Sequence, residues 1–98
     1  MTVQKLACQA CKGEVRVPEL SMAERETIAL LRTTETPRAI DAIMTLTGWS
    51  LQDSKRLALH LTTARGMCQG CRGALSERMG RCGHCGSVNI DWLPDTPA

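Results

Sequence analysis

Three Cys-x-x-Cys pairs in 98 residues constrain this chain more than any other feature of its sequence. The pairs contain every cysteine of the chain: Cys8 and Cys11, Cys68 and Cys71, Cys82 and Cys85. A Cys-x-x-Cys turn directs both sulfur atoms toward one point, as a tetrahedral metal site requires. The chain has two tryptophans and no phenylalanine or tyrosine, so its core has little aromatic surface and would gain much stability from a bound ion. The cysteine pattern therefore predicts a zinc protein.

Six cysteines could instead form disulfides in a secreted protein. The first residues contain no apolar stretch suited to a signal peptide, and no segment is suited to spanning a membrane. A disulfide between cysteines three positions apart closes a small loop and stabilises little. We therefore expect a cytoplasmic protein without membrane contact, whose thiols stay reduced and available to a metal.

The last two pairs are separated by ten residues, which is enough for two short strands and a turn. This pattern is similar to zinc ribbons, in which two knuckles at the ends of a β-hairpin close on one ion. We expect strands at 74–76, 79–81 and 87–92, with alternating apolar residues of the last strand on one face. The ribbon would occupy residues 67–93.

The ribbon predicts one zinc ion with four ligands: Cys68, Cys71, Cys82 and Cys85. Four sulfur atoms fill the tetrahedral shell of zinc and leave no position for water, so we expect this site to be structural. A zinc ion with four thiolates has a net charge of about −2. This charge offsets the formal +2 that the chain has with neutral thiols, so net charge gives no argument for a nucleic-acid partner.

The first pair, Cys8 and Cys11, has no neighbouring pair with which to share an ion. These thiols could join one of the other two pairs, or bind a second zinc together with His60 and a further ligand. They could also meet the same pair of a second copy, which would give a homodimer, or remain reduced thiols. A mixed or incomplete site can hold an exchangeable ligand, so any sensing or catalytic chemistry is expected here.

Local signals predict helices between the first and second pairs. Short strands are expected around the first pair, within residues 5–17. The serine and glutamate of residues 21–24 form a capping box, which predicts a helix that runs to about Arg32. Thr36 precedes a proline and is expected to cap a second helix, which Gly48 ends.

Ser50 is expected to cap a third helix that ends near Gly66. The predicted fold class is α+β. In this organisation, residues 1–66 form an N-terminal zinc knuckle and a three-helix segment, residues 67–93 form the C-terminal zinc ribbon, and residues 94–98 form a flexible tail.

The second and third helical segments carry a resemblance in their apolar, turn and basic residues: Ile40, Ile43, Thr47, Gly48, Leu51 and Lys55. This run resembles the helical hairpin in the C-terminal domain of the bacterial ribosomal stalk protein, except that Trp49 stands where that family favours leucine. The hairpin of that family docks translation factors, so the resemblance implies a docking role for Lys55. The whole chain is similar to small bacterial zinc-ribbon proteins of unassigned function.

Basic residues in and beside the ribbon indicate a second class of function. Four of them could contact the phosphates of a nucleic acid: Arg65, Arg72, Arg78 and Arg81. Only two tryptophans could stack on bases, so we expect a protein partner before a nucleic acid. The sequence therefore predicts a zinc-binding adaptor that is not an enzyme. The alternatives are a nucleic-acid-binding regulator and a metal or redox sensor that acts through Cys8 and Cys11.

Overall fold

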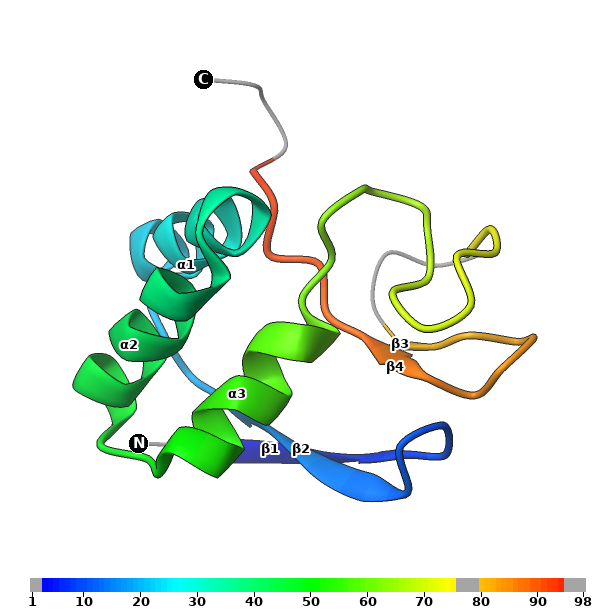
Figure 1. Cartoon of the computed structure of the whole chain (residues 1–98), viewed down its shortest axis with the longest axis horizontal. Helices are drawn as coiled ribbons and strands as arrows, with labels where there is room; N and C mark the ends of the chain where they lie inside the picture. Colours follow the sequence, from blue (N-terminus) through cyan, green and yellow to red (C-terminus); the bar gives the residue numbers. More distant parts are fainter. Residues whose placement is uncertain (1–2, 76–79, 95–98) are drawn as a thin grey trace.

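A computed structural model describes residues 3–75 and 80–94 of the chain. The elements follow in the order β1 (Val3–Cys8), β2 (Gly13–Pro18), α1 (Met22–Thr34), α2 (Thr36–Thr47), α3 (Leu51–His60), β3 (Gly80–Arg81) and β4 (Val88–Asn89). Figure 1 shows α1 and α2 at one end, α3 over the β1–β2 hairpin, and the β3–β4 ribbon at the other end. The fold is α+β, as predicted. In the part that the structure describes, no helix is both long enough and apolar enough to cross a membrane.

The first cysteine pair lies at the tip of an antiparallel hairpin, with Cys8 as the last residue of β1 and Cys11 in the turn. Strands β1 and β2 pair in a register that extends from Val3 opposite Pro18 to Cys8 opposite Gly13. Alternate residues of a strand face opposite sides, and Val15 and Val17 of β2 are accordingly buried. The short strands expected around this pair are therefore confirmed.

The capping box of α1 is confirmed. The Ser21 hydroxyl accepts the Glu24 N–H at 3.1 Å, and the Glu24 carboxylate accepts the Ser21 N–H at 2.9 Å. The helix continues to Thr34, two residues beyond the predicted end. These two reciprocal bonds satisfy backbone donors that the first turn of a helix leaves without partners.

The start of α2 differs from the prediction by one residue. Glu35 is the cap residue, and Thr36 is already helical. The Thr36 hydroxyl bonds instead to the preceding turn, where it accepts from the Arg32 guanidinium at 3.1 Å and donates to the Arg32 carbonyl at 3.3 Å. The end of α2 is as predicted, because Gly48 adopts a left-handed conformation with φ of 73°.

Helix α3 begins at its predicted cap but ends earlier than predicted. The Ser50 hydroxyl accepts the Asp53 N–H at 3.2 Å, yet the helix ends at His60 instead of near Gly66. A long-range pairing ends it, because the Ile90 N–H donates to the His60 carbonyl at 2.9 Å. Leu61 then forms a parallel bridge with Ile90, which replaces the next helical turn.

The ribbon strands also differ from the predicted pattern. Strand β3 pairs with β4, but β4 contains only two residues, because the backbone at Ile90 turns to pair with the end of α3. Ala74, expected to pair with the returning strand, forms a bridge with Met67 instead. Residues 76–79 of the predicted hairpin lie outside the described residues.

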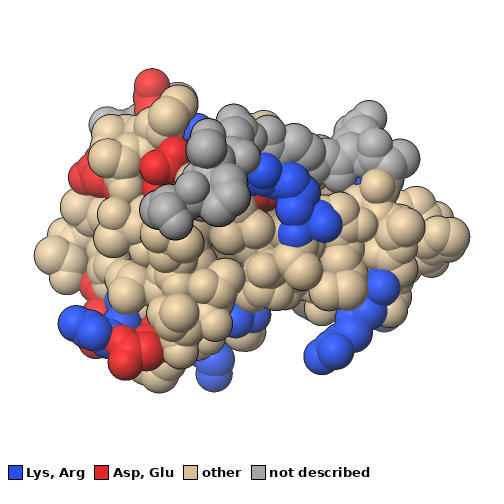
Figure 2. All heavy atoms as spheres, turned by 90° about the horizontal axis from the view of Figure 1, so that it is seen from above, with Lys and Arg blue, Asp and Glu red and all other residues tan. Residues whose placement is uncertain are grey.

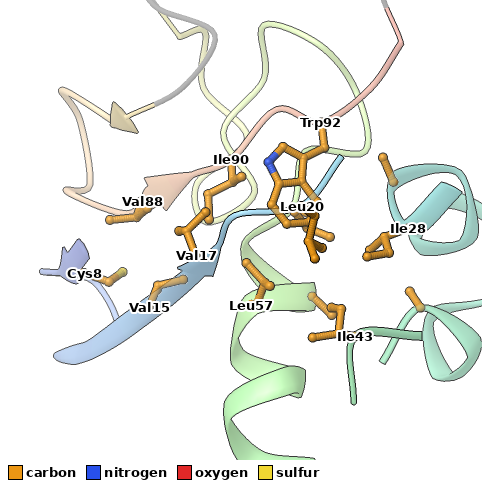
Figure 3. Close-up of a cluster of buried hydrophobic side chains, with 14 residues drawn as sticks. Cys8, Val15, Val17, Leu20, Ile28, Ile43, Leu57, Val88, Ile90 and Trp92 are labelled. Carbon is orange, nitrogen blue, oxygen red and sulfur yellow. The ribbon is translucent and has the colours of Figure 1, made fainter. Parts of the chain in front are cut away.

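One hydrophobic core joins the helices, the N-terminal hairpin and the ribbon (Figure 3). Its buried side chains come from every part of the chain and include Cys8, Val15, Val17, Leu20, Ile28, Ile43, Leu57, Leu61, Val88, Ile90 and Trp92. The predicted boundary between residues 66 and 67 stays a prediction, and residues on both sides of it share this core. The predicted tail beyond residue 94 lies outside the described residues.

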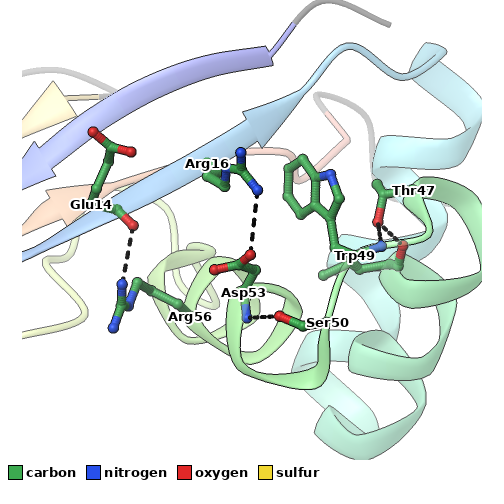
Figure 4. A network of polar contacts seen from close by, with 8 residues as sticks. Glu14, Arg16, Thr47, Trp49, Ser50, Asp53 and Arg56 are labelled. Carbon is green, nitrogen blue, oxygen red and sulfur yellow. Dashed lines mark hydrogen bonds and ion pairs between the residues drawn. The ribbon is translucent and has the colours of Figure 1, made fainter.

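Polar contacts align α3 along β2 (Figure 4). The Arg16 guanidinium of β2 contacts the Asp53 carboxylate at 3.3 Å and lies 5.7 Å from the ring centroid of Trp49, within cation–π range. One turn further along α3, the Arg56 guanidinium donates to the Glu14 carbonyl at 3.4 Å. These contacts hold the C-terminal end of α3 beside the turn that carries the first cysteine pair.

Loss of the α1 cap should destabilise the fold measurably. We expect Ser21→Ala to lower the free energy of unfolding by about 1 kcal/mol, because the N–H of Glu24 loses its acceptor. Denaturant unfolding of the metal-loaded protein at neutral pH would measure this difference. Glu26→Gln, on the same helix but outside the capping box, is the matched control and should leave stability nearly unchanged. An unfolding free energy of Ser21→Ala equal to that of the wild type would contradict the capping role.

Candidate metal centres

All three Cys-x-x-Cys pairs adopt a turn with the same backbone feature. The residue after the second cysteine has a positive φ in each: 57° at Lys12, 64° at Arg72 and 78° at Gly86. In the ribbon, the N–H of this residue donates to the carbonyl of the first cysteine, at 3.0 Å in both Cys68 and Cys82. Lysine and arginine rarely adopt this conformation, so the turn is retained against a local preference.

The four ribbon sulfurs converge on one point. All of them lie within 4.8 Å of one another, with Cys68 Sγ 3.6 Å from Cys85 Sγ and Cys71 Sγ 3.7 Å from Cys82 Sγ. A tetrahedral zinc ion, with zinc–sulfur bonds of about 2.3 Å, separates its sulfur ligands by about 3.8 Å. The four predicted residues therefore form a group that could hold a metal ion with little movement of any sulfur.

Backbone N–H groups surround these sulfurs. The amides two residues beyond Cys68, Cys71 and Cys82 donate to the sulfurs of those cysteines at 3.3 to 3.4 Å. Burial raises the pKa of Cys68, but hydrogen bonds from the N–H of Cys71 and other donors outweigh it and lower that pKa to about 6. Hydrogen-bond donors of this kind favour the thiolate, which is the form that binds a metal.

The sulfurs nevertheless oppose one another's ionisation. The Ser87 N–H lowers the pKa of Cys85, but burial and the three neighbouring cysteines together raise it to about 11. A cation among the four sulfurs removes this conflict, since it attracts every thiolate. The arrangement therefore suits a bound metal ion better than four free thiols.

Asn89 supports the four-cysteine group and was not identified from the sequence. Its side chain is fully buried and bonds to both sides of the group. The amide nitrogen donates to Cys68 Sγ at 3.4 Å and to the Ser87 carbonyl at 3.2 Å, and the amide oxygen accepts the Gln69 N–H at 2.7 Å. The sequence carries one signal for this role, which is a polar residue between the buried apolar Val88 and Ile90.

The first cysteine pair meets His60. The ligand atoms of Cys8, Cys11 and His60 all lie within 4.8 Å of one another. Cys11 Sγ is 3.7 Å from His60 Nε2, and a tetrahedral zinc ion with usual bond lengths would place such atoms about 3.6 Å apart. Of the arrangements that the sequence left open, the structure brings together the mixed group with histidine, separate from the four-cysteine group.

The tautomer of His60 follows from its second contact. His60 Nδ1 lies 2.7 Å from the Arg56 carbonyl oxygen, which can only accept a hydrogen bond. Nδ1 therefore carries a proton, and when the ring is neutral the lone pair is on Nε2, the nitrogen that lies beside Cys11. Metal-binding histidines commonly donate their other N–H in this way, so the contact orients the ring for a metal.

The two groups are joined through the backbone at residues 87 and 88. The Ser87 N–H lowers the pKa of Cys85 in one group, and the next N–H, that of Val88, lowers the pKa of Cys8 in the other. Burial raises the pKa of Cys8, but hydrogen bonds from the N–H groups of Cys11 and Val88, together with neighbouring side chains, lower it to about 6. The ribbon thus supplies a hydrogen bond that stabilises the first pair as a thiolate.

The four predicted nucleic-acid-binding arginines have different surroundings. The Arg65 guanidinium forms a bidentate salt bridge with the Asp91 carboxylate, with N–O distances of 2.8 Å and 3.2 Å. The Asp91 side chain is only 1% exposed. Arg72 and Arg81 are exposed, and Arg78 lies outside the described residues. Figure 2 shows basic side chains over the ribbon end of one face. A nucleic-acid role for these arginines stays a prediction.

Comparison of the chain with protein-family models, with curated proteins and with solved structures gives no match. The resemblances to the ribosomal stalk protein and to small bacterial zinc-ribbon proteins therefore stay predictions.

The role of Asn89 can be measured directly. We expect Asn89→Ala to lower metal affinity about 10- to 100-fold, as loss of a residue that supports a ligand does. It should also lower the free energy of unfolding by about 1–3 kcal/mol, because the partly buried Gln69 N–H loses its acceptor. Chelator competition and denaturant unfolding would measure the two effects, with the exposed Gln4→Ala as control. Unchanged metal affinity in Asn89→Ala would show that its bond to Cys68 has no supporting role.

Proposed function

We propose that this protein is a zinc-binding module with two metal centres, and that the four-cysteine centre is structural. The sulfur–sulfur distances of 3.6 Å and 3.7 Å carry the proposal, since they match the separation that tetrahedral zinc requires. Four thiolates fill the shell of the ion, so this centre has no position for a substrate. Soft sulfur ligands in tetrahedral geometry favour zinc over calcium or magnesium.

The four-cysteine centre would fold the ribbon around its ion. Strands β3 and β4 share only two residue pairs, so they hold the two knuckles together weakly. Zinc bound by such ligands contributes about 10–16 kcal/mol in zinc-finger peptides, far more than two pairs of strand residues. The ion would therefore place β4 and Ile90 against the core.

The Cys8–Cys11–His60 centre would hold the second zinc with only three protein ligands. Three protein ligands leave one position of a tetrahedral ion for an exchangeable ligand. Cys11 is exposed, so that ligand can come from solution. This centre supports the sensor alternative as well as a binding function, because both need a ligand that can leave.

The partner that we propose is a protein. Large apolar side chains stand exposed on all three helices: Met22, Leu30, Leu46, Leu51 and Leu59. Leu51 and Leu59 lie eight residues apart on α3, on the same face as Lys55 between them. This stripe leads to His60, so a partner seated on α3 would reach the second centre.

Zinc stoichiometry tests both centres. We expect native mass spectrometry to find two zinc ions per chain, and one in the double variant Cys8→Ala with Cys11→Ala. His60→Ala should lose or weaken only the second ion, because Nε2 is one of three ligands. The chain has one other histidine, and His84→Ala is the matched control, which should keep both ions.

Other stoichiometries would contradict parts of the proposal. One ion in the wild type, retained in the Cys8 and Cys11 double variant, would exclude the second centre. A half-integral number would indicate an ion shared between two copies of the chain. A four-cysteine group that takes up no zinc from a stoichiometric zinc solution would overturn the structural role.

A further inference from the structure

The Cys8–Cys11–His60 centre has one ligand fewer than a tetrahedral zinc ion needs. Within residues 3–75 and 80–94, no fourth cysteine, histidine, aspartate or glutamate joins this group. Cys8 is buried and faces Ser87 and Val88 of the ribbon, so that side of the centre is closed. Cys11 is exposed, which leaves the free position on the side of Cys11 and His60.

A pocket of about 230 Å³ opens on this side of the centre. Its lining residues come from the first knuckle and from α3: Cys11, Gln52, Lys55, Arg56, Leu59 and His60. Two of these carry positive charge, and none of the lining residues in the described part of the chain is acidic. Leu59 adds an apolar surface, with 47% of the residue exposed. The pocket therefore combines a metal position, cationic groups and an apolar wall.

These features select a class of ligand. The volume is smaller than that of a pocket for a drug-sized molecule, so the group that enters has few atoms. A zinc ion with two thiolates and a neutral histidine has no net charge, and an added anion would find Lys55 and Arg56 nearby. Carboxylate oxygen is a usual zinc ligand, and an attached apolar chain could cover Leu59.

We propose that the zinc of this centre takes a carboxylate with a short apolar chain as its fourth ligand. The inference rests on the proposed function, since it requires zinc at Cys8, Cys11 and His60. One carboxylate oxygen binds the ion as a water molecule leaves, and no bond within the ligand changes. The carboxylate can belong to a free organic acid or to the acidic side chain of a partner protein.

Cobalt substitution makes the exchange visible. Cobalt(II) replaces zinc with similar geometry, and its visible absorption depends on the ligands that surround it. Native mass spectrometry first establishes that both centres hold cobalt. Titration with hexanoate should then change the absorption spectrum in a saturable way, whereas hexanamide, its neutral counterpart, should change nothing. His60→Ala should abolish the response, and His84→Ala should retain it.

The contribution of the positive charge of Lys55 can be tested separately. We expect Lys55→Met to weaken hexanoate binding about tenfold, because the anion loses a nearby positive charge. Lys5→Met, which removes an exposed lysine of β1 that does not line the pocket, should leave the binding constant unchanged. Equal binding by Lys55→Met and wild type would remove Lys55 from the site.

Two further titrations, each with a short peptide, identify the source of the carboxylate. A short peptide with one glutamate flanked by leucines is compared with its glutamine counterpart and with hexanoate. Tighter binding of the glutamate peptide would indicate a protein as the source, and equal or tighter binding of hexanoate would indicate a small acid. A response to inorganic phosphate equal to that of hexanoate would overturn the choice of carboxylate.

The outcomes separate this inference from the proposed function. Absence of a second metal ion would overturn the proposed function, and this inference with it. A loaded second centre whose spectrum responds to neither hexanoate nor the glutamate peptide would overturn this inference alone. A metal-loaded chain that sediments as a dimer and gives no response to added acid would show that a second copy fills the position.

Discussion

Repulsion among four thiolates is the constraint on which the ribbon end of this molecule depends. The sulfurs lie at distances that suit a shared cation, and burial and three neighbouring cysteines raise the pKa of Cys85. Without an ion, the thiols can share this space only if some of them keep their protons, and the two residue pairs of β3 and β4 then hold the two knuckles together weakly. With an ion, Asn89 and the backbone amides complete a closed shell around it.

The same end of the chain shapes the second centre. Ile90 pairs with His60 and Leu61, which ends α3 at His60. The Val88 N–H lowers the pKa of Cys8, one position after the Ser87 N–H, which lowers the pKa of Cys85. A displacement of this backbone would therefore affect Cys8 and His60 together, and both are candidate ligands of the second centre. The two groups are separate in their ligands but share the segment that orients them.

Much of this fold could be predicted from the sequence because its signals are local. The caps at Ser21 and Ser50 and the left-handed Gly48 depend on a few neighbouring residues, and each was predicted correctly. The predicted end of α3 was wrong because the helix ends where its last residue pairs with Ile90, thirty residues further along the chain. No local pattern reports a pairing of that kind.

The candidate sites divide in the same way. Spacing alone grouped the four ribbon cysteines, since ten residues between knuckles permit few other arrangements. The partner of Cys8 and Cys11 stayed open, because it depends on how α3 lies along β2. Asn89 was missed for a related reason: its bonds to Gln69 and Cys68 exist only after the two knuckles meet.

The left-handed residue of each knuckle also bears on the order in which the molecule would capture its ions. Lysine and arginine at positive φ cost about 1 kcal/mol or more, so the turns at Lys12 and Arg72 are disfavoured before a metal binds. Gly86 has no such cost, and a side chain there would collide with Gln9 of the first knuckle. Of the three knuckles, the turn at Cys82 and Cys85 thus has the least backbone strain before a metal binds, so an ion would bind there first.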